Sequence, residues 1–119
     1  MNKYHAKRTA CNHGHNHASG REAKRCGELH LLLRAGVISA LVIEPTFILH
    51  VNGEPIIMGN GHKAKYRPDF TYQEGDKTVA EDVKGFIVRD FPLRAALFRS
   101  GYPGIELRVV KLPLQSKSG

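Results

Sequence analysis

The sequence has few cysteines and no long apolar segment, and both absences narrow the class of protein. Only two cysteines, Cys11 and Cys26, occur in 119 residues, so a secreted domain held by disulfides is not expected. No apolar run reaches the roughly 20 residues that a membrane-spanning helix needs. The first residues, MNKYHAKRTA, lack the apolar core of a secretory signal peptide. We therefore expect a soluble intracellular protein with no membrane partner.

Acidic residues are scarce relative to basic ones. Eleven Asp and Glu oppose eighteen Lys and Arg, which gives a formal net charge of +7. Surplus positive charge attracts polyanions, and nucleic acid is the commonest of these partners. The length predicts a single domain with a modest core, and a hydrophobic content of 41% is enough for a folded chain.

Hydrophobic spacing predicts two helices and five strands. The first helix covers 19–36, with Ser19 as N-cap, Gly36 as the stop, and Cys26, Leu29 and Leu33 on one face. The second covers 91–100 and follows Asp90 as N-cap. Strands are expected at 37–51, 56–58, 66–72, 78–84 and 105–111, with turns at Asn52-Gly53, Asn60-Gly61 and Glu74-Gly75-Asp76.

The resulting order, α-β-β-β-β-α-β, predicts an α/β or α+β domain with a mixed central sheet flanked by helices. The final β-α-β stretch suits a parallel crossover. We expect three segments, which are a basic, His-rich N-terminal arm at 1–18, the folded domain at 19–111 and a polar tail at 112–119.

Two acidic residues and a lysine on neighbouring predicted strands are the main candidates for chemistry. Asp82 and Lys84 share one strand face because side chains alternate, and a hairpin would bring Asp69 beside Asp82. Two carboxylates bind a divalent cation, and an ammonium stabilises a phosphate, so the group suits phosphodiester hydrolysis. The alternative is an exposed hairpin with a weak surface ion pair. The nearby Pro68-Asp69 and the basic helix that follows favour the metal site.

Two further acidic residues, Glu22 and Glu81, are candidates for the same site. Glu22 shares the helical stripe of Cys26 and Leu29, so it faces the sheet, where a carboxylate must be paired, capped or metal-bound. The run 19–22, Ser-Gly-Arg-Glu, also fits a capping box, which alone explains Glu22. Glu81 is a reserve ligand, because alternation places it on the face opposite Lys84.

Several of these runs resemble a known family. Tyr-Arg-Pro-Asp-Phe at 66–70 and Glu-Asp-Val-Lys-Gly at 81–85 resemble the signature of the PD-(D/E)xK nuclease superfamily. The helix start at 19–22 resembles that of phage-encoded junction-resolving endonucleases. The chain is most similar to small phage and prophage proteins assigned to the superfamily. The shared pattern is Lys3-Tyr4, Ser19 to Ala23, Asp69-Phe70, Glu81 to Gly85, Leu97-Phe98 and Tyr102-Pro103.

The resemblance implies a restriction-endonuclease-like core over 19–111, in a phage or prophage protein of the bacterial cytoplasm. It implies Mg²⁺ or Mn²⁺ on Asp69, Asp82 and the Val83 backbone carbonyl, with Glu22 as an outer or second-metal ligand. Lys84 would serve the nucleophilic water, and no small-molecule cofactor is expected. The expected activity is hydrolysis of DNA phosphodiester bonds by an endodeoxyribonuclease, on branched or recombination-intermediate DNA. Two symmetric cuts in the DNA need two active sites, so a homodimer is expected. The alternatives are a nonspecific or restriction-like nicking nuclease and a noncatalytic DNA-binding module.

Basic residues on both sides of the motif are candidates for contacts to the DNA backbone. Lys63, Lys65 and Arg67 alternate on one strand face, although lysines also protect edge strands. Arg89 and Arg94 follow the strand that carries Lys84, where a solvated helix surface is the alternative.

The N-terminal arm carries one further pattern. Cys11, His13, His15 and His17 alternate, so an extended segment would place them on one face, where zinc could bind. Their spacing matches the usual structural zinc sites poorly, and we expect a polar arm instead. If zinc did bind there, the protein would be a zinc-stabilised interaction domain, which is the third functional alternative.

Overall fold

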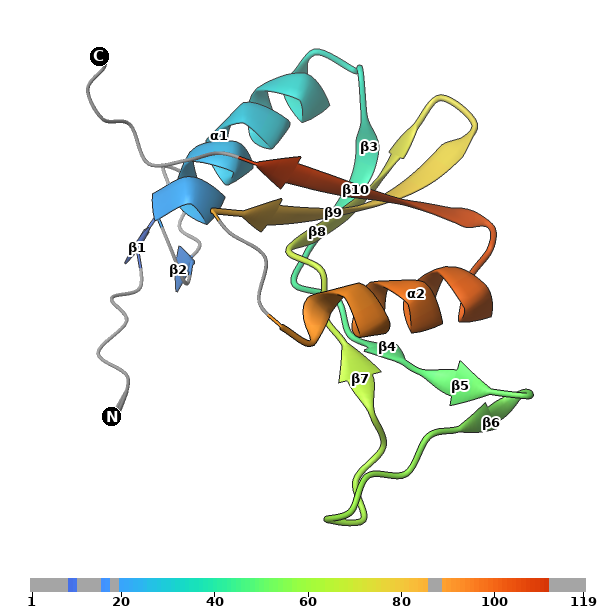
Figure 1. The fold of residues 1–119 in the computed structure, drawn as a ribbon. Helices are drawn as coiled ribbons and strands as arrows, with labels where there is room; N and C mark the ends of the chain where they lie inside the picture. The colour runs from blue at the N-terminus through green and yellow to red at the C-terminus, as the bar shows by residue number, and fades with distance from the viewer. Residues whose placement is uncertain (1–8, 11–15, 18–19, 86–88, 112–119) are drawn as a thin grey trace.

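A four-stranded mixed sheet with two helices forms the body of the molecule (Figure 1). The computed structural model describes residues 9–10, 16–17, 20–85 and 89–111. The strand order is β10-β9-β8-β3, in which β10 runs parallel to β9 and the other two pairings are antiparallel. The bounds are α1 Gly20–Arg34, β3 Ser39–Ile43, β8 Phe70–Glu74, β9 Lys77–Lys84, α2 Phe91–Gly101 and β10 Ile105–Lys111. The predicted mixed sheet and parallel β-α-β connection are confirmed.

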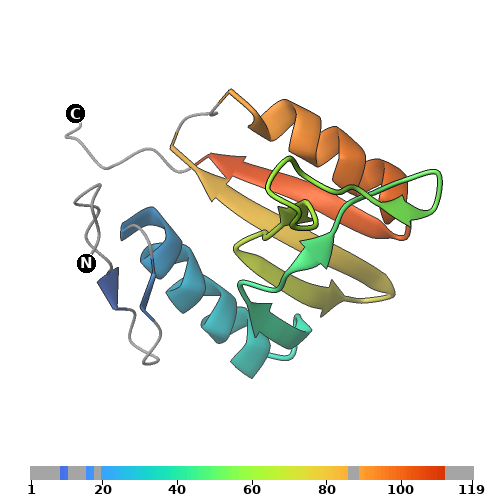
Figure 2. The same cartoon turned by 90° about the horizontal axis from the view of Figure 1, so that it is seen from below.

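The two helices cover opposite faces of the sheet, as Figures 1 and 2 show. Strand β9 contributes buried side chains to both faces of the sheet, because successive side chains of a strand point to opposite sides. Val79 and Val83 join the core that includes Cys26 and Leu29 of α1. Ala80, between them, joins the core that includes Phe98 of α2. Strand β9 is therefore the buried centre of the domain.

Helix α1 matches its predicted position but differs in which leucine it buries. Leu29 is fully buried, whereas Leu33, predicted on the same stripe, is 37% exposed. Leu32 packs against the core instead. The chain leaves the helix at Gly36, whose φ of +81° suits a residue without a Cβ.

Two of the predicted strands are interrupted beside prolines. The segment predicted at 37–51 divides into β3, β4 Phe47–Ile48 and β5 His50–Val51. The segment predicted at 66–72 divides into β7 Lys65–Tyr66 and β8. Pro45 and Pro68 lie in these breaks, where a residue without an N–H cannot continue a hydrogen-bonded ladder. Glu44, before Pro45, has a φ of +52°, which turns the chain out of β3.

The short strands between these breaks belong to a second arm, residues 47–66, which lies beside α2 and is distinct from the N-terminal arm (Figure 1). β4 pairs with β7, and β5 pairs with β6 Glu54–Pro55 across the predicted Asn52-Gly53 turn. The strand predicted at 56–58 is reduced to one bridge between Ile57 and Lys63. The last described pair, β1 Thr9–Ala10 with β2 Asn16–His17, is antiparallel.

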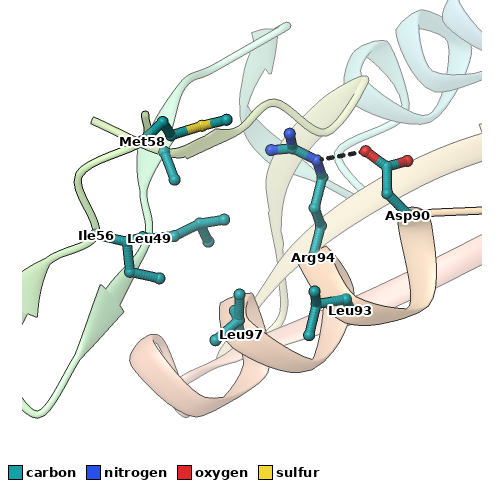
Figure 3. Close-up of a pocket in the computed structure, with 8 residues that line it drawn as sticks. Leu49, Ile56, Met58, Asp90, Leu93, Arg94 and Leu97 are labelled. Carbon is teal, nitrogen blue, oxygen red and sulfur yellow. Dashed lines mark hydrogen bonds and ion pairs between the residues drawn. The ribbon is translucent and has the colours of Figure 1, made fainter. Parts of the chain in front are cut away.

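Aromatic packing joins the arm to α2 and leaves a hollow beside it. Phe47 meets the Phe98 and Tyr102 rings edge-on at centroid distances of 5.0 and 5.1 Å. The hollow has a volume of about 220 Å³ and is mainly apolar, with the Arg94–Asp90 ion pair among its lining residues (Figure 3). Its lining consists of Leu49, Ile56, Met58, Ala64, Asp90, Leu93, Arg94 and Leu97.

A buried ion pair fastens α1 to β9. Glu81 is fully buried, and both of its carboxylate oxygens accept hydrogen bonds from Arg25, at 2.5 Å from Nε and 3.0 Å from Nη2. The Tyr72 hydroxyl donates to the same carboxylate at 2.7 Å. Burial, together with this bond to Glu81, raises the pKa of Tyr72 to about 12. Satisfied charges of this kind specify how the helix sits on the sheet.

Removing the arginine from this pair should destabilise the fold. In Arg25→Met the Glu81 carboxylate stays buried without its cation, and we expect the free energy of unfolding to fall by about 3 kcal/mol. Urea denaturation followed by circular dichroism measures the change. Lys24→Met removes an exposed charge from the preceding position of α1 and should leave the midpoint nearly unchanged. Equal midpoints for the two variants would show that the pair does not anchor α1.

Candidate functional site

The β8–β9 hairpin places Asp69 beside the C-terminal part of β9. Phe70 pairs with Glu81, so Asp69, one residue earlier, is level with Asp82. The Val83 N–H donates to Asp69 Oδ2 at 2.7 Å, which orients the carboxylate. The Glu44 N–H donates to the Asp69 carbonyl at 2.8 Å and holds the backbone of the same residue. Asp69 is thus fixed between β3 and β9.

Asp82 and Lys84 lie on one face of β9, as strand alternation predicted. Asp82 is 4% exposed and accepts a hydrogen bond from the Tyr66 hydroxyl. Lys84 Nζ lies 3.6 Å from Asp82 Oδ1 and 4.5 Å from the centre of the Phe91 ring. Burial and the bond to Asp82 both raise the pKa of Tyr66, so its hydroxyl keeps the proton that it donates. The ammonium is therefore held between a carboxylate and an aromatic face.

Negative charge is concentrated around Asp69. Its pKa is raised to about 9, first by burial and then by the charges of Asp82 and Glu22, although the Val83 N–H opposes the shift. Glu22 reaches this neighbourhood from the first turn of α1 and is 4% exposed. Asp69, just before β8, is therefore near both Glu22 of α1 and Asp82 of β9, and Lys84 is near Asp82.

The carboxylate oxygens at this site suit a cation that needs few protein ligands. Within the described ranges, no three His, Cys, Asp or Glu side chains are grouped so that they could hold a metal ion. Glu22 therefore does not add a third direct ligand to Asp69 and Asp82 in the described structure, and its expected place as an outer or second-metal ligand stays a prediction. Mg²⁺ commonly binds through one or two carboxylates and keeps several waters. Asp69 and Asp82 fit that requirement, and a divalent cation would relieve their mutual repulsion.

Glu81, the reserve ligand, serves a structural purpose on the opposite face. Its carboxylate is occupied by Arg25 and Tyr72, so strand parity separates it from Lys84 as expected. Nothing in the sequence pattern marked Arg25 as its partner, because the two residues lie 56 positions apart.

The basic residues before Asp69 form an exposed row, which we call the basic row: Lys63, Lys65 and Arg67. Each is exposed, while Ala64 and Tyr66 between them are buried, so the predicted alternation is present. Arg67 is 61% exposed and lies 3.7 Å from Glu44, a spacing that leaves its remaining donors available to a ligand.

The two arginines after β9 differ from each other. Arg89 is exposed, whereas Arg94 is half-buried. The Arg94 side chain binds Asp90 at 3.0 Å and also donates to the Lys65 carbonyl, so it ties α2 to β7. That tie is a structural role that sequence reasoning missed.

Other sequence-based candidates lie elsewhere. Cys11, His13 and His15 of the alternative zinc site are outside the described residues, and only the backbone of His17 is described, in β2. Tyr66 was missed as a partner of Asp82, although it begins the Tyr-Arg-Pro-Asp-Phe run. None of Asp69, Asp82 and Lys84 lines the hollow beside α2.

These features define a mixed α+β domain in which a half-buried Asp69, a buried Asp82 and a lysine lie together. Over residues 1–117 the sequence matches the family model described as a protein of unknown function (DUF1064), and the chain belongs to that family. Neither the curated proteins nor the solved structures gave a match. Within the part of the chain that is described, neither helix is long and apolar enough to span a membrane.

The raised pKa of Asp69 predicts a stabilising substitution. A carboxyl that holds its proton more tightly when folded favours the fold at low pH, and this contribution is lost as the pH rises toward about 9. Asp69→Asn removes the charge and keeps an oxygen for the Val83 N–H. Without metal at pH 8, we expect its Tm to exceed the wild-type value by roughly 4–8 °C, equivalent to about 1 kcal/mol.

Differential scanning calorimetry in EDTA from pH 5 to pH 8 measures this effect. Asp76→Asn, in the exposed β8–β9 turn, is the matched control and should show no growing advantage with pH. If Asp69→Asn is no more stable than wild type at pH 8, the Asp69 carboxyl does not carry the electrostatic cost described above.

Proposed function

We propose that this protein is a metal-dependent endodeoxyribonuclease that hydrolyses DNA phosphodiester bonds. The observation that carries the proposal is the half-buried Asp69 beside the buried Asp82, with Lys84 Nζ 3.6 Å from Asp82 Oδ1. Ionising two carboxylates side by side in a partly dehydrated place is costly, which raises the pKa of Asp69, and a cation that binds both would offset that cost. A divalent cation and a phosphate, bound together, supply the required positive charge and a partner for the lysine.

The proposal extends to the architecture. We infer a restriction-endonuclease-like core, because the first acid of the PD-(D/E)xK signature lies just before β8 while the second acid and the lysine lie on β9, its antiparallel partner in a mixed sheet. The resemblance to phage and prophage proteins supports a source in a phage or prophage and a substrate of branched or recombination-intermediate DNA. A restriction-like or nonspecific nicking activity uses the same chemistry on a different DNA.

Each side chain at the site can have a separate role in the proposed reaction. Asp69 and Asp82 would hold Mg²⁺ or Mn²⁺, which when bound polarises the phosphate and acidifies a water. The Val83 N–H orients Asp69, and the Tyr66 hydroxyl orients Asp82. Lys84 can donate a hydrogen bond to a phosphate oxygen or to the attacking water, and its place above Phe91 limits its motion.

The position of the basic row supports DNA as the polymer. Lys63, Lys65 and Arg67 are exposed on the segment that leads directly to Asp69. A DNA strand that lies along the basic row would reach the carboxylates. Several of its phosphates would already be neutralised by these side chains. Phosphate contacts of this kind place the substrate without reading its bases.

Replacing the carboxylates or the lysine should abolish cleavage and preserve the fold. We expect wild type to cut DNA with Mg²⁺ or Mn²⁺ but not with EDTA, and Asp82→Asn and Lys84→Gln to lose at least about 100-fold in rate. Labelled single-stranded, duplex, flap and four-way-junction DNA, resolved on gels, measure both the rate and the preferred structure.

Two matched controls keep this test specific. Asp76→Asn and Lys77→Gln make the same chemical changes in the turn and at the opposite end of β9, and both should cleave normally. Equal trace cleavage by wild type and Asp82→Asn would refute the enzyme. Metal-independent DNA binding without cleavage would favour the noncatalytic DNA-binding module, which is consistent with the lack of a third direct ligand in the described part of the chain.

Neutralising the basic row should weaken DNA binding and leave catalysis by bound substrate nearly intact. For Lys63→Gln/Lys65→Gln we expect the slope of log K against log salt to fall by about 1.8, which is about 0.9 for each phosphate that is no longer neutralised. Fluorescence anisotropy in EDTA measures the slope. Lys24→Gln/Arg34→Gln, which removes the same charge from the exposed part of α1, should retain the wild-type slope; equal reductions in both double variants would mean that only net charge matters.

A further inference from the structure

Arg21 occupies the space that a side chain at position 85 would need. A Cβ built on Gly85 would lie 2.4 Å from Arg21 Cζ, 2.6 Å from Nε and 2.7 Å from Nη2. The guanidinium therefore lies directly against the backbone of Gly85, the residue that follows Lys84. Arg21 also precedes Glu22 in α1, so it borders the carboxylate site in space and in sequence.

The position of Arg21 is unfavourable for stability in three ways. Its Nε is buried and has no hydrogen-bond partner among the described residues, which forfeits the energy of that bond. It is the second residue of α1, where the helix dipole repels a cation. It also keeps this place only while position 85 is a glycine, because a Cβ there would have to push the guanidinium aside. Proteins accept such costs mainly at functional sites.

We propose that Arg21 is a substrate-binding residue that grips a DNA phosphate next to the bond under attack. The inference rests on the proposed function, because it places a phosphodiester at Lys84 and the carboxylate pair. A guanidinium presents its donors in a planar fork that matches a phosphate, and the bound anion would compensate its charge. Gly85 is then the residue that lets the fork lie close to the backbone of the catalytic strand.

The same geometry explains why Arg21 suits an anion better than a carboxylate of the protein. Arg25, one helical turn later, is half-buried and is satisfied by Glu81 and Glu28, so it has an internal purpose. Arg21 is also half-buried, yet its Nε lacks such a partner in the described residues. The two arginines thus separate into one that fastens α1 to β9 and one that is left for a ligand.

DNA binding in EDTA tests Arg21 independently of cleavage. For Arg21→Gln we expect the slope of log K against log salt to fall by about 0.9, the value for a single phosphate. Fluorescence anisotropy with a labelled duplex and a labelled four-way junction measures it. Arg21→Lys should restore the slope, because it keeps the charge, but only part of the affinity, because it lacks the fork. Arg34→Gln, which removes the same charge from the last turn of α1, should match wild type.

Gly85→Ala provides a second route to the same displacement. The new methyl group must push the guanidinium aside, so we expect the reduced affinity of Arg21→Gln, and little additional reduction when both changes are combined. Independent, additive effects would mean that the glycine serves another purpose. A calorimetric Tm for each variant excludes unfolding as the cause, since removing an unsatisfied donor should not lower it.

The outcomes separate this inference from the proposed nuclease. Wild-type cleavage with Mg²⁺, with Arg21→Gln unchanged in binding, salt slope and KM, overturns the role of Arg21 alone. DNA binding without cleavage, with the slope reduced in Arg21→Gln, overturns the nuclease and retains the phosphate contact. Failure of wild type to bind DNA overturns both. A raised KM with a smaller change in kcat is the expected kinetic signature.

Discussion

The hydrogen bond from the Val83 N–H to Asp69 Oδ2 is the contact on which the site depends. It links the residue before β8 to the residue between Asp82 and Lys84, and it therefore fixes the hairpin register where the acids meet. A slip of one residue would send Asp82 and Lys84 to the α1 face and Glu81 to the α2 face. The fully paired hairpin, from Phe70–Glu81 to Glu74–Lys77, prevents that slip.

The two faces of β9 handle buried charge in opposite ways. On the α1 side, Glu81 is neutralised by Arg25 and contributes to the docking of the helix. On the other side, the Lys84 ammonium lies beside Asp82, while burial and the neighbouring acids raise the pKa of Asp69. The first arrangement specifies the fold. The second weakens the fold slightly, and in the proposed function it is the place where a cation and a phosphate would bind.

Sequence patterns predicted elements well where local chemistry dominates. Helix α1 and strand β9 follow from apolar spacing and strand alternation, and the Asn52-Gly53 turn from its special backbone angles. The predictions failed where distant packing decides. The strands predicted through Pro45 and Pro68 are interrupted around these residues, and Leu32 takes the core position predicted for Leu33. The hydrogen bond from Arg94 to the Lys65 carbonyl was not predicted, because the two residues lie 29 positions apart.

The sequence by itself determined the mixed α+β class, the shared face of Asp82 and Lys84, and the separation of Glu81 from them, because strand alternation is a local rule. Only the tertiary structure decided that Tyr66 holds Asp82, that Arg25 neutralises Glu81 and that Arg21 rests against Gly85. Those contacts join segments separated by 16, 56 and more residues, and their formation depends on how α1 and the arm pack on the sheet. No spacing within one element encodes that packing.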